Sequence, residues 1–230
     1  MHFHVPLFYL LNLEGIDAAN CLQLNLRQTF LMKIKASTII AVSFLFALYS
    51  CGNKKEQSKS QPAVISKSKN SDSFNLAFDS VLLAYNSLKD AFINWDTASV
   101  NRSAQALQYA VISVPYTELH DDANATKATS IAQNTADGLQ TLLNVDSIGD
   151  KRRFFYTVSE SVYKLIEAVN YDKAVIYHKK CPMAFNGDRE GWWISETRKM
   201  DNPYFGNKHP KYKNAMLECG TVEDSINNMQ

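Results

Sequence analysis

The sequence predicts a mainly α-helical fold for residues 74–230, an up-and-down four-helix bundle with a small C-terminal β-hairpin and loop cap. Apolar residues recur at helical spacing in four successive segments, and the connections between these segments are short. After Tyr171 the pattern changes to short, strand-like apolar runs. Short connections favour antiparallel neighbouring helices, which is the up-and-down arrangement.

The first two helices are predicted from apolar faces and a capping residue. Asp96 is a residue that favours the N-cap position and is predicted to cap the second helix, and Pro115 marks the end of that helix. The apolar face of the first helix contains Phe74, Phe78, Val81, Leu82, Tyr85, Leu88 and Phe92, and that of the second contains Val100, Ala104, Leu107 and Val111.

The third helix is predicted over about residues 124–145, and the fourth begins near Asp150. The inward residues of the third are Ala128, Ile131, Thr135, Leu139 and Leu142, and those of the fourth are Phe154, Phe155, Val158, Val162, Leu165, Ile166 and Val169. Residues 174–177 and 192–195 read as two strands joined through a turn-forming stretch at 186–191, which predicts a β-hairpin. The rest of the tail is predicted to be loop.

Residues 32–51 have the pattern of a bacterial lipoprotein signal peptide. A short basic start is followed by an uncharged apolar run, and Leu48-Tyr49-Ser50-Cys51 resembles a lipobox whose Cys51 thiol receives the lipid. The apolar run has about 14 residues, whereas a membrane-spanning helix needs roughly 20. We therefore expect a lipoprotein anchored through Cys51 on the periplasmic side, or on the outer-membrane or cell-surface side.

The segments on either side of the lipobox follow from this interpretation. A signal peptide should begin the protein, so residues 1–31 are expected to be an upstream extension from a mis-called start codon. Residues 52–73 are rich in Ser, Lys, Gln and Asn and are predicted to be a flexible tether.

Composition and motifs narrow the function class. Acidic and basic residues nearly balance, with a net charge of +1, so nucleic acid is not an expected partner. No Ser/His/Asp arrangement, phosphate-binding glycine loop or paired carboxylates in an apolar setting stand out. A binding protein is therefore expected, and not an enzyme.

Sulfur-containing residues gather in the last 60 positions. Cys181 has Met183 two residues away, Cys219 has Met216 three residues away, and His178 precedes Cys181 by three. One interpretation is a Cys181–Cys219 disulfide, because lipoproteins occupy an oxidising compartment. The other is a site for a soft ion such as Cu(I), because thiolate and thioether sulfurs select soft metals. The sequence leaves both open.

Several motifs resemble the domain of unknown function 3347 family over roughly residues 76–225. These are Ala84-Tyr85-Asn86-Ser87-Leu88-Lys89-Asp90-Ala91, Arg153-Phe154-Phe155-Tyr156-Thr157-Val158-Ser159, Tyr177-His178-Lys179-Lys180-Cys181-Pro182-Met183-Ala184, Gly191-Trp192-Trp193-Ile194-Ser195, Asn202-Pro203-Tyr204-Phe205-Gly206 and Met216-Leu217-Glu218-Cys219-Gly220. Residues 207–214 form an insertion relative to that pattern.

The resemblance implies a functional context. Similar domains occur as stand-alone lipoproteins and as appendages of periplasmic adaptor subunits of copper and silver efflux pumps. It implies Cu(I) or Ag(I) as the bound ion, a metal-efflux adaptor as the partner besides the membrane, and ligands at Cys181, Met183, Met216 and Cys219, with His178 optional. The alternative is a non-metal interaction protein stabilised by the Cys181–Cys219 bridge.

Overall fold

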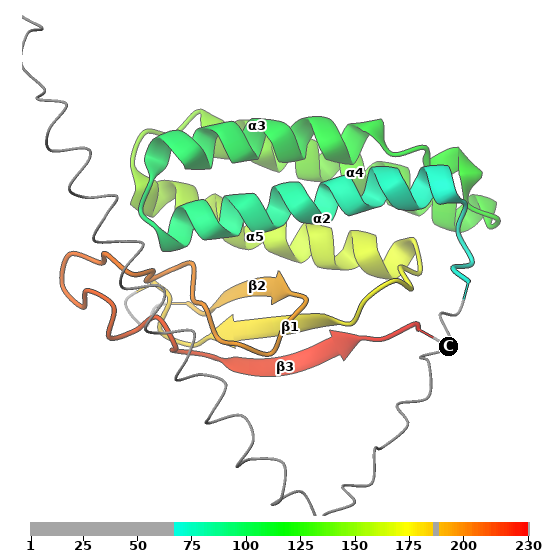
Figure 1. Ribbon diagram of the computed structural model, residues 1–230. Coiled ribbons are helices and arrows are strands. Elements are labelled where there is room, and N and C mark those ends of the chain that lie inside the picture. Colours follow the sequence, from blue (N-terminus) through cyan, green and yellow to red (C-terminus); the bar gives the residue numbers. More distant parts are fainter. Residues whose placement is uncertain (1–66, 186–188, 230) are drawn as a thin grey trace, which may run out of the picture. The chain divides into compact units, whose positions relative to one another are not determined.

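The computed structural model describes residues 67–185 and 189–229, and over those residues it contains four α-helices and a three-stranded sheet (Figure 1). The helices are α2 (Asp72–Ile93), α3 (Thr97–Ser113), α4 (Asp122–Leu143) and α5 (Ile148–Ala168). Consecutive helices pack side by side, which confirms the predicted bundle. The predictions for the upstream extension, the lipoprotein signal with Cys51 and most of the tether lie outside the described residues.

Each of these helices begins at a side chain that caps it. The Asp96 carboxylate accepts a hydrogen bond from the Ser99 N–H at 3.0 Å, which confirms the N-cap predicted for the second helix. Ser71 caps α2 in the same way, so that α2 begins at Asp72, within the stretch assigned to the tether. The other two caps are Asp121 for α4 and Ser147 for α5.

Aromatic side chains of α2 and α5 contact one another at the centre of the core. Phe155 lies 4.8 Å from Phe92 and 5.7 Å from Tyr85 between ring centroids, and all three are almost fully buried. The Tyr85 hydroxyl is within hydrogen-bonding distance of Ser159 and accepts the Ile194 N–H. Tyr85 therefore joins the bundle interior to the sheet, and its burial raises the pKa of its phenol.

The sheet has the strand order β2-β1-β3 and is antiparallel throughout. The strands are β1 (Ile176–Cys181), β2 (Gly191–Ser195) and β3 (Thr221–Ile226). The predicted hairpin is confirmed, although its first strand begins two residues later and runs on to Cys181. In Figure 1 the sheet lies beside α5, and α5 contacts β2.

The third strand corrects the sequence prediction, which left the tail after the hairpin as loop. β3 is mostly exposed and polar, with Glu223 and Asp224 at its centre, so it lacks the apolar alternation of a half-buried strand. Its strand conformation comes from backbone pairing with the free edge of β1. Such pairing leaves no signature in side-chain pattern.

A buried arginine attaches the C-terminal loops to the bundle. Arg152 of α5 donates to the Phe92 carbonyl at 2.8 Å and to the Pro203 carbonyl at 2.9 Å, and its guanidinium lies 4.0 Å from the Trp95 ring centroid. Gly206 sits against the same corner with φ +61, and a Cβ there would be 2.4 Å from the Ile93 carbonyl oxygen. Only glycine fits this position without strain.

Candidate functional site

The sheet brings Cys181 and Cys219 together. Cys181 is the last residue of β1, and Cys219 precedes β3 by two residues. Because Lys180 pairs with Thr221, both cysteines come to the same end of the two strands. Their Sγ atoms are 3.3 Å apart, whereas a disulfide bond measures about 2.05 Å. The structure therefore holds two free thiols in direct contact.

The two thiols differ in exposure. Cys181 is completely buried, and Cys219 is half-buried. Burial, followed by the contact with Cys219, raises the pKa of the Cys181 thiol to about 12, although the Met183 N–H and the Asn202 side chain act in the opposite direction. The Cys181 thiol is therefore protonated near neutral pH, and a metal ion would have to displace that proton on binding.

Asn202 fixes the segment that contains Cys219. Its side chain is fully buried, and its amide donates to the Cys219 carbonyl at 2.7 Å. Its backbone N–H donates to the Leu217 carbonyl at 2.8 Å. Its Oδ1 accepts the N–H groups of Tyr204 and Phe205, so one buried amide connects two separate loops. Asn202 was part of a motif recognised in the sequence, but its positioning role was not predicted.

The two predicted methionine ligands lie in different surroundings. Met183 lies two residues after the end of β1 and is 47% exposed, and its N–H contacts the Cys181 sulfur. Met216 is half-buried against the core, and its carbonyl accepts the Cys219 N–H at 3.1 Å. Both methionines thus belong to the chain segments that hold the thiols, with Met183 the more accessible.

Met200 is a further sulfur near the site, and sequence reasoning missed it. A Cβ at Gly220, the residue after Cys219, would lie 3.2 Å from the Met200 Sδ atom. The thioether therefore lies beside the backbone that follows Cys219. Met200 has no cysteine near it in the sequence, so only the folding of the loop after β2 reveals its position.

His178 does not join the thiols. The pairing of β1 with β2 is regular from Tyr177 to Cys181, so residues three apart point to opposite faces of the sheet. The His178 Nε2 atom lies 2.8 Å from the Glu160 carboxylate of α5, and the ring stacks on Tyr163 at 3.9 Å. The geometry argues against His178 as a ligand beside Cys181.

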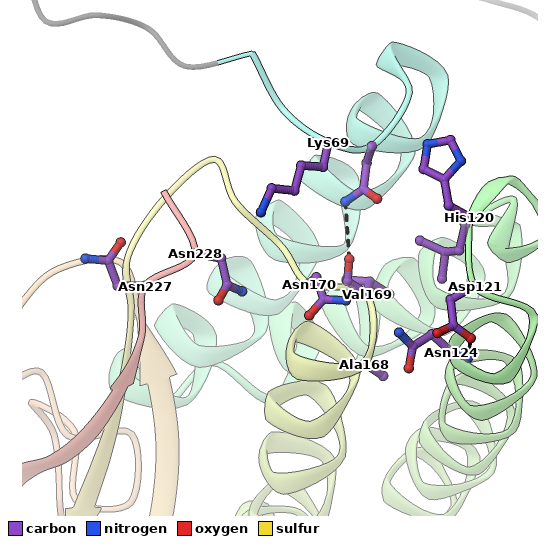
Figure 2. A pocket seen from close by; sticks show the side chains of 11 residues that line it. Lys69, His120, Asp121, Asn124, Ala168, Val169, Asn170, Asn227 and Asn228 are labelled. Carbon is purple, nitrogen blue, oxygen red and sulfur yellow. Dashed lines mark hydrogen bonds between the residues drawn. The ribbon is translucent and has the colours of Figure 1, made fainter. Parts of the chain in front are cut away.

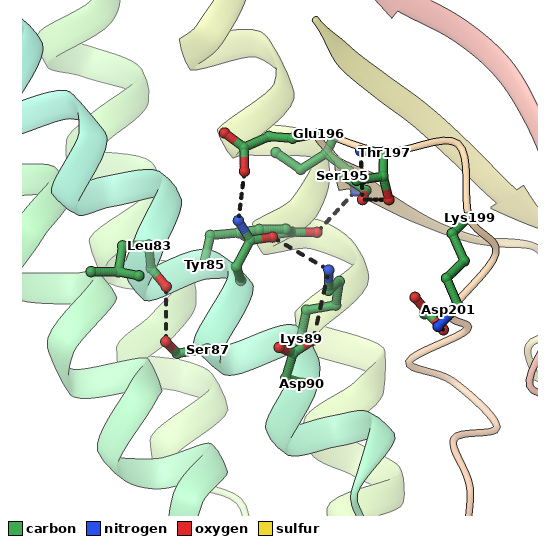
Figure 3. Close-up of polar contacts among 12 residues, drawn as sticks. Leu83, Tyr85, Ser87, Lys89, Asp90, Ser195, Glu196, Thr197, Lys199 and Asp201 are labelled. Carbon is green, nitrogen blue, oxygen red and sulfur yellow. Dashed lines mark hydrogen bonds and ion pairs between the residues drawn. The ribbon is translucent and has the colours of Figure 1, made fainter. Parts of the chain in front are cut away.

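Polar contacts fix the segment from Ser195 to Asp201, which leads from β2 past Met200. The Asn86 amide of α2 donates to the Glu196 carboxylate at 3.4 Å, and Lys199 and Asp201, which are labelled in Figure 3, form an ion pair at 3.0 Å. The buried Lys179 amine of β1 donates to the Lys199 carbonyl. Helix α2 and strand β1 therefore both position this segment.

The inserted loop 207–214 packs on the corner of the bundle. His209 lies 5.5 Å from Trp95 and 5.3 Å from Phe205 between ring centroids, and its Nδ1 accepts the N–H groups of Lys211 and Tyr212. Burial, together with the neighbouring Arg152 charge, lowers the pKa of His209. The insertion is thus anchored to the bundle by aromatic contacts.

A separate cavity of about 450 Å³ lies where the start of α4, the end of α5 and the tail after β3 approach one another (Figure 2). Most of the residues that line it are of polar type, among them His120, Asp121 and Asn124. Asp121 is occupied in capping α4, and the Asn70 amide donates to the Val169 carbonyl. No thiol or thioether lines this cavity, so it is distinct from the sulfur site.

Two findings concern only residues 67–185 and 189–229. Within these ranges no three His, Cys, Asp or Glu side chains are grouped so that they could hold a metal ion. In the same part of the chain, none of the helices combines the length and apolar character needed to cross a membrane. A metal at the Cys181–Cys219 pair would have the two thiolates as its charged ligands.

Comparison with known families gives one match. The family model described as "Protein of unknown function (DUF3347)" matches residues 81–174, from α2 through α5 to the approach to β1. The match covers the bundle and ends before Cys181, so the sulfur-containing motifs lie beyond it. Comparisons with curated proteins and with solved structures gave no match.

Proposed function

The chain belongs to the DUF3347 family through its residues 81–174, and from that premise we propose that it binds a soft metal ion, Cu(I) or Ag(I), at the paired thiols of Cys181 and Cys219. The observation that supports this proposal is the 3.3 Å contact between the two Sγ atoms. Thiolates select soft ions, and two adjacent thiolates offer Cu(I) or Ag(I) two strong ligands without large rearrangement.

Thioethers complete the proposed ligand set. Met200, Met183 and Met216 all belong to segments that adjoin the thiols. A thioether is a neutral, soft ligand that forms no disulfide in an oxidising compartment, so it suits an exchangeable Cu(I) site there. The exposed Met183 and the half-buried Cys219 provide the side from which an ion would enter.

We place this site in an extracytoplasmic lipoprotein that is attached to the membrane through Cys51. The support is the signal-like pattern of residues 32–51 and the polar tether that follows it. In this setting the protein captures the ion and transfers it to a metal-efflux adaptor. This role is binding and transfer, without catalysis.

A competition titration tests the metal site. The chain beginning at Gly52, which retains every residue that the structure describes, is reduced and titrated anaerobically with Cu(I) against a chelator. We expect one Cu(I) per chain. The Cys181→Ser/Cys219→Ser double variant should bind more than about 100-fold more weakly, because both charged ligands are lost.

Met229→Leu is the matched control for that titration. It removes an exposed methionine sulfur from the tail after β3 and should leave the affinity unchanged. An affinity that is equal in the parent chain and in the double cysteine variant would remove the metal assignment.

Membrane attachment is tested separately in the full-length chain. Cys51→Ser should move the protein from the membrane fraction to the soluble fraction and abolish incorporation of labelled palmitate. A Cys219→Ser variant, which removes a thiol of the C-terminal part of the chain, should have neither effect. Unchanged labelling of the Cys51 variant would contradict the anchor.

The same thiol contact also favours a second function, that of an interaction protein with a structural disulfide. Oxidation would bring the sulfur atoms from 3.3 Å to about 2.05 Å. A bridge across 38 residues would stabilise the fold by about 3–4 kcal/mol. Counting free thiols in protein isolated from its native compartment separates the two functions, because a permanent bridge leaves neither Cys181 nor Cys219 reactive.

A further inference from the structure

Helices α2 and α3 expose four large apolar side chains, of which Leu83 and Tyr109 line a groove between the two helices. Leu76 and Leu83 of α2 are 72% and 70% exposed, and Tyr109 and Ile112 of α3 are 72% and 55% exposed. The two leucines are seven residues apart, which is two helical turns, so they lie along one line of α2. Clustered exposure of this kind typically marks an interaction site.

An apolar groove runs between the two helices. It encloses about 570 Å³, and small residues form most of its lining, among them Ala77, Ser80 and Ala84 of α2 and Ala106 and Ala110 of α3. The large exposed side chains of Leu83 and Tyr109 flank these small residues and form the sides of the groove. The face therefore has both ridges and hollows, which is the surface relief that packing helices interdigitate.

We propose that this α2/α3 face is the interface of a two-fold symmetric homodimer. A two-fold interface uses the same patch on both subunits, so the patch must be complementary to itself. In the proposed dimer the two-fold axis lies in the plane of the face and perpendicular to the helices, so the helices of the two copies run antiparallel. The Leu83 and Tyr109 side chains of one copy then lie over the small residues of the other. The same face thus supplies both the projections and the recesses.

The charges at the two ends of the face fit this symmetry. Arg102 lines the groove near the start of α3. Glu118 lies just beyond the end of α3 and accepts hydrogen bonds from Ser71 and Ser73 at the start of α2. Because the axis exchanges the two ends, Arg102 of each copy approaches Glu118 of the other. Opposite charges then meet at both rims.

The available area is sufficient for a weak dimer. Leu76, Leu83 and Tyr109, together with the small residues of the groove, offer roughly 500 Å² per copy, hence about 1,000 Å² in total, which is near the lower limit for a specific interface. We expect a dissociation constant in roughly the micromolar range. The sheet packs on α5, and α3 lies on the opposite side of the bundle (Figure 1). The dimer therefore leaves the Cys181–Cys219 site of each subunit accessible.

Sedimentation equilibrium of the chain beginning at Gly52 tests the dimer. The parent chain should dimerise reversibly with concentration. Leu83→Glu/Tyr109→Glu should be monomeric over the same range, because it places four like charges in the apolar interface. Met229→Glu, which adds a charge at another exposed apolar residue, should dimerise like the parent. Circular dichroism verifies that each variant is folded.

Two further sets of variants distinguish loss of the interface from a folding defect. Ala106→Arg fills the groove from an exposed position outside the core and should also give a monomer. Arg102→Glu should weaken the dimer, and adding Glu118→Arg should restore it. A parent chain that stays monomeric to about 100 μM, some hundredfold above the expected dissociation constant, would overturn the proposal. A dimer that survives Leu83→Glu/Tyr109→Glu and Ala106→Arg would overturn it equally.

Discussion

Apolar side chains meeting at helical spacing hold the four-helix bundle together, whereas polar groups that reach across the fold hold the C-terminal cap of residues 176–229. In the bundle, residues such as Phe155 and Leu139 are buried among many similar neighbours. In the cap, the buried amide of Asn202 and the buried amine of Lys179 each hydrogen-bond to loop carbonyls. The two regions share one core but are stabilised by different interactions.

This difference indicates why the candidate chemistry lies in the cap. A redundant apolar core tolerates small changes of side chain but offers no polar or sulfur ligand to a visiting ion. Hydrogen bonds fix the cap at a few points and leave Cys219 and Met183 accessible beside a buried thiol. The comparison predicts that removing a single polar or backbone contact that attaches the cap to the bundle costs more stability than a matched change on the bundle surface.

Arg152→Ala should have the largest effect. It removes hydrogen bonds to the Phe92 and Pro203 carbonyls together with the contact to the Trp95 ring. The Phe92 carbonyl keeps the Trp95 N–H as a donor, whereas the buried Pro203 carbonyl loses the Arg152 N–H. We expect the free energy of unfolding to fall by about 4 kcal/mol. Urea unfolding followed by circular dichroism measures it.

The neighbouring Arg153 supplies the control for that change. It is exposed, and its guanidinium lies over the Phe185 ring. Arg153→Ala should lower the free energy of unfolding by no more than about 1 kcal/mol. Equal losses in the two variants would show that the buried arginine does not attach the cap to the bundle.

Gly206→Ala should be the next most damaging change. The residue has φ +61, and the added Cβ would approach the Ile93 carbonyl oxygen to 2.4 Å, so backbone would have to move. We expect a loss of about 3 kcal/mol in the free energy of unfolding.

Gly149→Ala in α5 is the matched control, since its Cβ would meet only the Ser147 hydroxyl at 3.7 Å. A helical glycine replaced by alanine should gain up to about 1 kcal/mol. If both substitutions shifted the unfolding midpoint in the same direction, the close fit of the Gly206 turn against α2 would be excluded.

The same division between bundle and cap explains what could be predicted from the sequence. The four helices followed from apolar periodicity and from capping residues such as Asp96, which are local signals. The strand β3 did not, because its exposed side chains carry no pattern and only pairing with β1 orders it. The predicted thiol pair comes together because the antiparallel register carries Cys219 back to Cys181.

The remaining site residues were hidden because their contacts are long-range. Arg152 reaches a carbonyl 51 residues away and another 60 residues away. Met200 comes near Gly220 only through the course of the loop after β2. Such contacts depend on the finished fold, and composition or spacing along the chain does not reveal them.

Met200→Leu tests whether a thioether of the cap contributes to Cu(I) affinity without contributing to the stability of the fold. The two side chains have similar volume, so the free energy of unfolding should change by less than about 1.5 kcal/mol. If the Met200 thioether is a ligand, the Cu(I) affinity should fall by about tenfold, which is the size of effect expected for a supporting group.

Met183→Leu in the same chelator competition shows which thioether matters more. Met183 is 47% exposed, so its side chain can leave the site more easily and its loss should weaken binding less than the loss of Met200. If neither substitution changed the affinity, the ion would be held by the thiolates alone.

The smallest predicted effect is on the acid dependence of stability, and it concerns the N-cap of helix α3 in the bundle. Hydrogen bonds from the Ser99 side chain and, less strongly, from its backbone N–H lower the pKa of Asp96. The ionised carboxylate therefore stabilises the fold at pH values above its unfolded pKa of about 3.9. This contribution is lost as the pH falls through the lower pKa of the folded state. Asp96→Asn keeps a capping acceptor but removes the charge. Between about pH 5 and pH 2 the variant should therefore lose slightly less stability in urea unfolding than the parent.

Parallel pH profiles for the parent and Asp96→Asn would mean that the charge at the start of α3 is immaterial. The helix would then begin there because Asp96 supplies an acceptor, a role that asparagine fills equally well.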